Sequence, residues 1–60
     1  MKRILIYRNS PFGRMYLCRD GSTSTNRNEA GEHWEMQFES VVAENWIVNT
    51  PTPAQKEFIS

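Results

Sequence analysis

The first third of the chain has the pattern of a β-hairpin. Residues 2–8 contain an apolar run of β-forming residues, and a cluster of turn-forming residues follows at 9–13. Residues 14–19 then alternate along their length as a strand does. We therefore predict two antiparallel strands joined by a turn.

Both faces of the second predicted strand carry apolar side chains. Met15 and Leu17 point to one face, whereas Tyr16 and Cys18 point to the other. A two-stranded ribbon of this kind needs a cover on each face, and one short helix supplies only one of them. We expect the second cover to come from another copy of the chain.

Residues 32–38 alternate between polar and apolar side chains and predict a third strand. Its buried face would hold Trp34, Met36 and Phe38, and its solvated face would hold His33. A histidine among charged neighbours on such a face is expected to be an ordinary surface residue.

The apolar spacing then changes to that of a helix. Val41 and Val42 follow at helical intervals, Ser40 is a suitable N-cap, and Asn45 is a suitable end. We predict a short helix here and a fourth strand at 46–48. The expected architecture is α+β: a small antiparallel sheet, made of the N-terminal hairpin and one or two further strands, with one short helix.

Two segments are less regular. The sequence at 52–55 has a hydroxyl cap followed by proline, which predicts one or two helical turns with Phe58 and Ile59 docking as an apolar lid. Residues 22–31 are polar, small or charged, which is long for a loop in so small a domain. This loop fits either a flap over a site or a disordered connection.

Length and cysteine content set the broad class. Sixty residues make a single domain, 1–60, and a chain of this size buries only about 60% of its unfolded surface. The lone Cys18 excludes a disulfide within the chain, so we expect a homo-oligomer. One unpaired cysteine, no apolar run of about 18 residues and no targeting segment predict a cytoplasmic protein with no membrane span.

Net charge is zero, but the two halves differ strongly. Residues 1–27 hold six basic side chains and one acidic one, giving 6 − 1 = +5, and residues 28–60 give 1 − 6 = −5. One interpretation is that the halves complement each other within the fold or between subunits. The other is a basic face that meets an anionic ligand or nucleic acid.

Catalytic and metal-binding patterns are not found in the sequence. His33 is the only histidine, so every nucleophile–base pair would have to include it. One histidine beside scattered glutamates is not the spaced ligand set of a zinc or iron site, and the three glycines do not form a phosphate loop. We expect no enzyme activity, no cofactor and no metal. Cys18 reads as a buried structural residue, with a reactive thiol as the alternative.

Arginines alternate with aromatic residues in the hairpin and just after it. Guanidinium groups bind phosphates in bidentate fashion and aromatic faces stack on bases, so this mixture suits a nucleotide. Long nucleic acid is less favoured because the second half cancels the positive charge of the first. The candidate residues for binding a ligand or partner are Arg8, Phe12, Arg14, Tyr16, Arg19 and Arg27.

The stretch from Trp34 to Val48 resembles the C-terminal signature of a family of small phage proteins that includes the second Thoeris anti-defence type. The similarity lies in two tryptophans twelve residues apart, Trp34 and Trp46, a short helix between them that ends Ala-Glu-Asn, and a closing apolar strand. The resemblance covers about a quarter of the chain. It implies a compact α+β oligomer that sequesters a nucleotide-derived signal without degrading it, with both tryptophans as scaffold.

Three functions follow as hypotheses. The first is a non-enzymatic phage-type inhibitor in the host cytoplasm that binds an anionic, nucleotide-like ligand. The second is an inhibitor that binds a host or defence protein, such as a CRISPR-type complex, through its acidic helix face or its basic hairpin. The third is binding of single-stranded nucleic acid, which would weaken steeply with salt.

Overall fold

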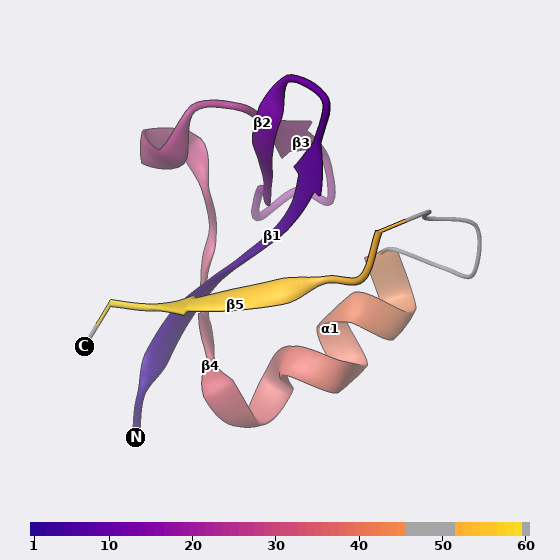
Figure 1. Cartoon of the computed structure of the whole chain (residues 1–60). Helices are drawn as coiled ribbons and strands as arrows, with labels where there is room; N and C mark the ends of the chain where they lie inside the picture. Colours follow the sequence, from indigo (N-terminus) through magenta and orange to yellow (C-terminus); the bar gives the residue numbers. More distant parts are fainter. Residues whose placement is uncertain (46–51, 60) are drawn as a thin grey trace.

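Strand β1, Arg3–Ser10, is the strand around which the sheet is built (Figure 1). The computed structural model describes residues 1–45 and 52–59. Its other elements are β2 (Gly13–Leu17), β3 (Thr23–Ser24), a 3-10 turn (Arg27–Glu29), β4 (Glu32–Trp34), a second 3-10 turn (Glu35–Gln37), α1 (Phe38–Asn45) and β5 (Gln55–Phe58). The predicted α+β class, with an antiparallel sheet and one short helix, is confirmed.

Both edges of β1 are used. Tyr7 pairs with Tyr16 of β2 on one side and with Gln55 of β5 on the other. Nearer the start of β1, Ile4 pairs with His33 of β4 and also with Phe58 of β5. Strands β2 and β4 therefore follow one another along the same edge of β1, while β5 runs along the opposite edge, and β3 extends the sheet beyond β2.

The predicted hairpin forms, with a tighter turn than the sequence indicated. Ser10 pairs with Gly13, which leaves a two-residue turn of Pro11 and Phe12. Gly13 has a φ of 110°, a region that side chains with a Cβ rarely enter. The Ser10 hydroxyl donates to the Gly13 carbonyl over 2.7 Å, and the Phe12 amide donates to that hydroxyl over 3.2 Å. These bonds let both strands continue into what was predicted as loop.

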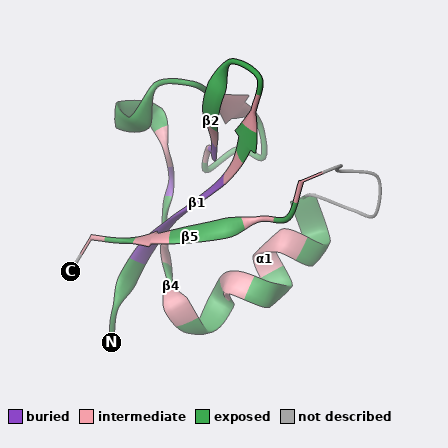
Figure 2. Cartoon of the chain, viewed as in Figure 1, coloured by how far each residue is buried: buried purple, intermediate pink, exposed green. Residues whose placement is uncertain are grey.

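Each face of β1 has its own apolar core, as the two-faced pattern predicted. Buried residues lie along β1 in Figure 2. On one face Ile4, Ile6 and Leu17 are covered by α1 and Ala54. On the other, Leu5, Tyr7 and Tyr16 are packed against Ala30 and Ile59. The second cover therefore comes from the chain itself. Self-association stays a prediction that rests on the small size of the chain, because the second face is not bare.

The third strand is shorter than predicted, and its faces are reversed. It ends at Trp34 because the Gln37 side chain accepts a 3.1 Å hydrogen bond from the Trp34 amide and starts a 3-10 turn. The predicted buried residues Trp34 and Met36 are 43% and 75% exposed. His33 instead pairs with Ile4 and shares its face, on the side of α1.

Helix α1 confirms the predicted short helix, although it begins at Phe38. Ser40 is not the N-cap, because its hydroxyl donates to the Gln37 carbonyl within the first turn. Phe38, Val41 and Val42 face the core as their spacing predicted. The predicted strand at 46–48 lies outside the described residues.

The C-terminal segment is a strand, so the predicted helical turn is wrong. Gln55–Phe58 pairs with β1, and the Ile59 amide continues the ladder by donating to the Arg3 carbonyl over 3.0 Å. This pairing satisfies backbone groups along half of one edge of β1, which outweighs a local capping signal. Ile59 does dock on the second core, as the lid prediction required, whereas Phe58 is 49% exposed.

The polar segment 22–31 has regular local structure. Thr23 and Ser24 pair with β2, and the Asn26 side chain accepts from the Asn28 amide to cap the first 3-10 turn. The Gly31 amide then donates to the Leu17 carbonyl over 3.0 Å. This segment carries Ala30 onto the second core, so it contributes to the fold.

Candidate functional site

The six predicted binding residues lie in three places. Arg14, Tyr16 and Arg27 meet beside β5, and Arg8 and Phe12 lie at the tip of the hairpin. Arg19 follows β2 and lines a separate cleft. The arginine–aromatic mixture of the sequence therefore does not form one continuous surface.

Arg14, Tyr16 and Arg27 all bind the carboxylate of Glu57. Arg14 Nη1 is 3.0 Å from Oε1, and the Tyr16 hydroxyl donates to the same oxygen over 2.9 Å. Arg27 Nε and Nη2 hold Oε2 at 2.7 and 2.6 Å. These bonds lower the pKa of Glu57, that from Arg27 most and that from Tyr16 next.

Glu57 thus fills the position that a bound anion was predicted to take. Arg14 also lies 4.2 Å above the Tyr7 ring, so its guanidinium is held on two sides. Sequence reasoning missed Glu57 because it placed the segment in a helix. The charge difference between the halves was the signal for it: among the residues that the structure describes, three of four ion pairs join the basic half to the acidic half.

A second cluster lines an open cleft of about 500 Å³ at the other end of the sheet. Pairing of β1 with β4 places Arg3 beside Trp34, and the Gly31–Leu17 hydrogen bond brings the chain after β2 against the start of β4. A Cβ on Gly31 would lie 2.8 Å from the Arg19 amide nitrogen, so this approach requires glycine. The lining residues are Arg3, Arg19, Glu32, His33, Trp34 and Gln37.

The cleft is mildly electropositive. Arg3 forms a 3.1 Å ion pair with Glu32, and Arg19 adds a second cation, which gives 2 − 1 = +1 for the lining. Burial lowers the pKa of His33 and the charge of Arg19 lowers it further, against a smaller opposing effect of the Gly31 carbonyl. His33 is therefore neutral at pH 7, and its Nδ1 is buried without a hydrogen-bond partner in the described chain.

These groups can hold an anion and an aromatic ring together. Trp34 offers an exposed indole face, Arg19 and Arg3 offer guanidinium groups, and Gln37 offers an amide. Sequence reasoning included only Arg19 of this cleft. Trp34 was assigned to a buried face and His33 to a solvated one, and the reversed register of β4 changed both roles.

The remaining chemistry is limited. Cys18, the residue that follows β2, is a half-buried free thiol. In residues 1–45 and 52–59, no group of three or more His, Cys, Asp or Glu side chains is placed to hold a metal ion. Within the same ranges, no helix has both the length and the apolar character needed to cross a membrane.

Part of the stretch that carries the anti-defence resemblance lies outside the described residues, including Trp46. The other tryptophan, Trp34, lines the cleft, whereas the resemblance gave it a scaffold role. Membership of that family stays a prediction. No protein-family model, curated protein or solved structure matches the chain.

Proposed function

We propose that this chain is a non-enzymatic binding protein that holds a small anionic, aromatic ligand of the nucleotide type in the cleft beside Trp34. The observation that carries the proposal is the convergence of the exposed Trp34 indole with Arg19 and the neutral His33 ring in one cleft. A cavity of about 500 Å³ lies in the range that small-molecule sites occupy.

Each group has a part in such binding. The Trp34 ring stacks on a base, and Arg19 pairs with a phosphate. One nitrogen of the neutral His33 ring donates and the other accepts, so the ring can pair with a hydroxyl or an exocyclic amine of the ligand. Binding without turnover would make the protein a sequestering inhibitor, the role that the anti-defence resemblance implies.

A small ligand fits the charge distribution better than a long nucleic acid does. Arg3, Arg14 and Arg27 are all paired with glutamates of the acidic half. Phosphate contacts supply most of the affinity for a nucleic acid strand, and a strand needs several unpaired cations in a row. The cleft has a net charge of +1, from Arg3 and Arg19 against Glu32, within a space the size of one small ligand.

Isothermal titration of the folded chain with AMP, ADP-ribose, a cyclic nucleotide, adenosine and inorganic phosphate tests the proposal. We expect at least one nucleotide to bind more tightly than adenosine or phosphate alone. Trp34→Ala should weaken it about 5- to 150-fold, the range for loss of one stacked base. Arg19→Gln should weaken it more than Arg27→Gln, which removes the same charge outside the cleft.

Heat from none of these ligands, with the chain shown to be folded, would refute the proposal. So would equal losses in Arg19→Gln and Arg27→Gln, because binding would then follow overall charge. A salt dependence that is steeper for a single-stranded oligonucleotide than for AMP would favour the nucleic-acid hypothesis instead.

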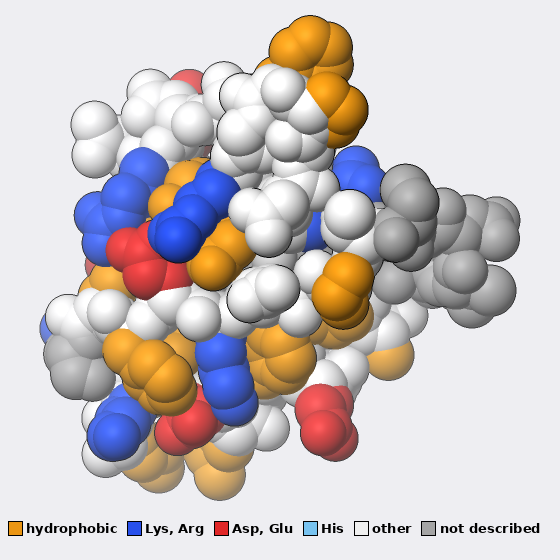
Figure 3. Space-filling model, in the orientation of Figure 1, with side chains coloured by type: hydrophobic (Ala, Val, Ile, Leu, Met, Phe, Trp, Pro, Cys, Tyr) orange, Lys and Arg blue, Asp and Glu red, His pale blue; other side chains and the backbone are white. Residues whose placement is uncertain are grey.

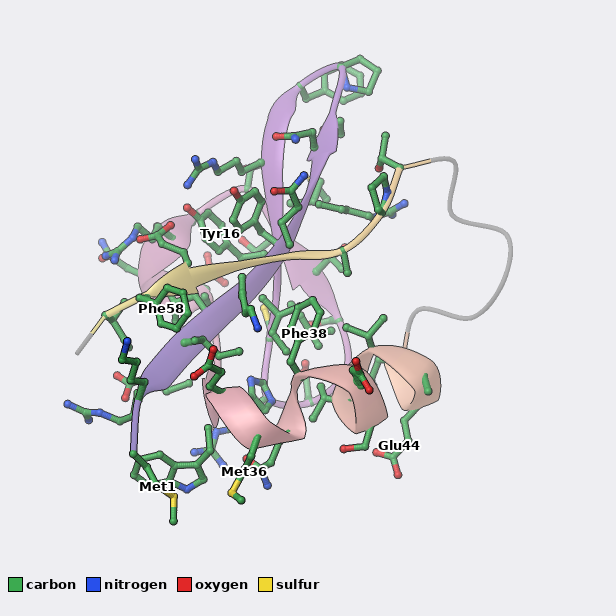
Figure 4. All side chains as sticks on the ribbon, turned by 60° about the horizontal axis from the view of Figure 1, so that its bottom comes forward. Met1, Tyr16, Met36, Phe38, Glu44 and Phe58 are labelled. Atoms are coloured by element: carbon green, nitrogen blue, oxygen red, sulfur yellow. The ribbon has the colours of Figure 1, made fainter. Side chains whose placement is uncertain are left out.

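A protein-binding inhibitor is the second candidate, favoured by one observation. Met1 and Met36 (Figure 4) are 90% and 75% exposed. Together with Trp34 they border a small hollow. Flexible methionines around an aromatic ring are frequent at protein-binding surfaces. Met36→Ser should abolish recovery of a stoichiometric protein partner from host lysate while it leaves nucleotide titrations unchanged.

A further inference from the structure

The turn between β1 and β2 projects from one end of the molecule (Figure 1), and hydrophobic side chains lie at that end (Figure 3). Phe12 is 88% exposed, although it sits in a turn that is fixed by the Ser10 hydroxyl and by Gly13. A fixed turn lowers the entropy lost when this ring is buried by a partner. Exposed aromatic residues on rigid supports are typical anchors of protein interfaces.

Next to this ring lies an apolar groove of about 570 Å³. Phe12 itself, Pro11 and Met15 line it together with Arg8, and Asn9, Ser10 and Thr52 add polar groups. The Thr52 hydroxyl donates to the Asn9 carbonyl over 2.9 Å and so ties the segment before β5 to the hairpin. The groove and the projecting ring therefore belong to one patch of surface.

We propose that this patch is a two-fold interface with a second copy of the chain, in which each Phe12 enters the groove of its partner. A knob and a groove on the same patch allow two copies to exchange their knobs across a two-fold axis, and such an exchange closes as a dimer. The electrostatics also fit, because the Arg8 guanidinium beside the groove would meet the face of the partner's Phe12 ring, a favourable cation–π contact.

The area indicates how tight such a dimer is. A buried phenylalanine contributes about 150–250 Å² of buried surface, so two of them supply roughly 300–500 Å². Stable interfaces bury at least about 1,200 Å² in total. Met15, Pro11 and the polar groups of the groove must supply the rest. The dimer therefore belongs in the weak class, with a dissociation constant between micromolar and millimolar.

Sedimentation velocity from micromolar to about 1 mM chain tests the interface, with millimolar protein needed because the contact is weak. We expect the average mass to rise from 7.0 kDa toward 2 × 7.0 = 14.0 kDa and no further. Phe12→Ser should weaken the dimer roughly tenfold or more. Met36→Ser removes another exposed apolar residue, one that lies outside this patch, and should leave the dimer unchanged.

Circular dichroism of Phe12→Ser and Phe12→Leu checks that both variants keep the fold, and Leu should retain part of the dimer. A wild-type chain that stays at 7.0 kDa throughout would overturn the proposal and assign the tip to a different protein. Growth beyond a dimer, or a loss in Met36→Ser but not in Phe12→Ser, would also overturn it. None of these results depends on nucleotide binding.

Discussion

Replacement of Tyr16 by phenylalanine measures what the tyrosine hydroxyl contributes to stability through its hydrogen bond to Glu57. The ring stays packed against Tyr7 at a centroid distance of 5.6 Å, and only the hydroxyl that donates to Glu57 is lost. A hydrogen bond to a charged group contributes about 1.5–3 kcal/mol. Because the Glu57 side chain is 23% exposed and keeps both arginines, we expect the lower end, about 1.5 kcal/mol.

That loss is large for a chain of this size. Typical domains have about 0.05–0.15 kcal/mol per residue, or about 3–9 kcal/mol for 60 residues. In urea denaturation followed by circular dichroism, a slope of about 1 kcal/mol/M turns the loss into a midpoint shift of about 1.5 M. Tyr7→Phe is the matched control, because the structure describes no hydrogen bond from Tyr7 to Glu57.

A midpoint for Tyr16→Phe within about 0.3 M of the wild type would refute the reasoning, given the same slope. It would mean that the two arginines satisfy Glu57 fully without the hydroxyl. A shift of equal size in Tyr7→Phe would also refute it, because the effect would then come from loss of any tyrosine hydroxyl in this core.

Three further changes test other parts of the fold by the same denaturation assay. Ile6→Ala, at a fully buried position, should cost about 2–5 kcal/mol, whereas Met36→Ala on the surface should stay within about 0.5 kcal/mol; equal losses would contradict the assigned core. Gly31→Ala should destabilise by about 1–3 kcal/mol, because its methyl group meets the Arg19 backbone, and no loss would mean that this approach is loose. The pKa of Glu57 is lowered from 4.5, so its charge adds stability that is fully present above pH 4.5 and lost as pH falls through the lower folded value. Glu57→Gln should be less stable at neutral pH and lose less on acidification, and an unchanged acid profile would contradict the cluster.

The sequence predicted the parts of the fold that depend on local pattern. The hairpin followed from its apolar run and turn residues, and both cores followed from the two-sided alternation at Tyr16 and Leu17. The helix prediction for the C-terminal segment was wrong because a capping signal is local. The strand that pairs with residues 55–58, β1, is about fifty residues away in the sequence. No pattern within the segment itself reports such a partner.

The candidate cleft was less predictable than the fold. Alternation at 32–38 gave the strand but not its register, and a shift of one residue exchanges the two faces. The exchange brought His33 to the side of α1 and left Trp34 in the cleft. The sequence showed only that the basic and acidic residues lie in different halves of the chain. It could not show that Arg14 and Arg27 pair with Glu57.

The pairing of β1 with β5 also sets the order of folding. Ile4 and Phe58 are neighbours in space but 54 positions apart, so closing this pair costs more chain entropy than closing the adjacent β1–β2 hairpin. We expect the hairpin to form early and β5 to join late. Until β5 joins, Tyr16 lacks Glu57 and the second core lacks Ile59. A chain cut before residue 55 would therefore stay partly open and be an easy substrate for proteases.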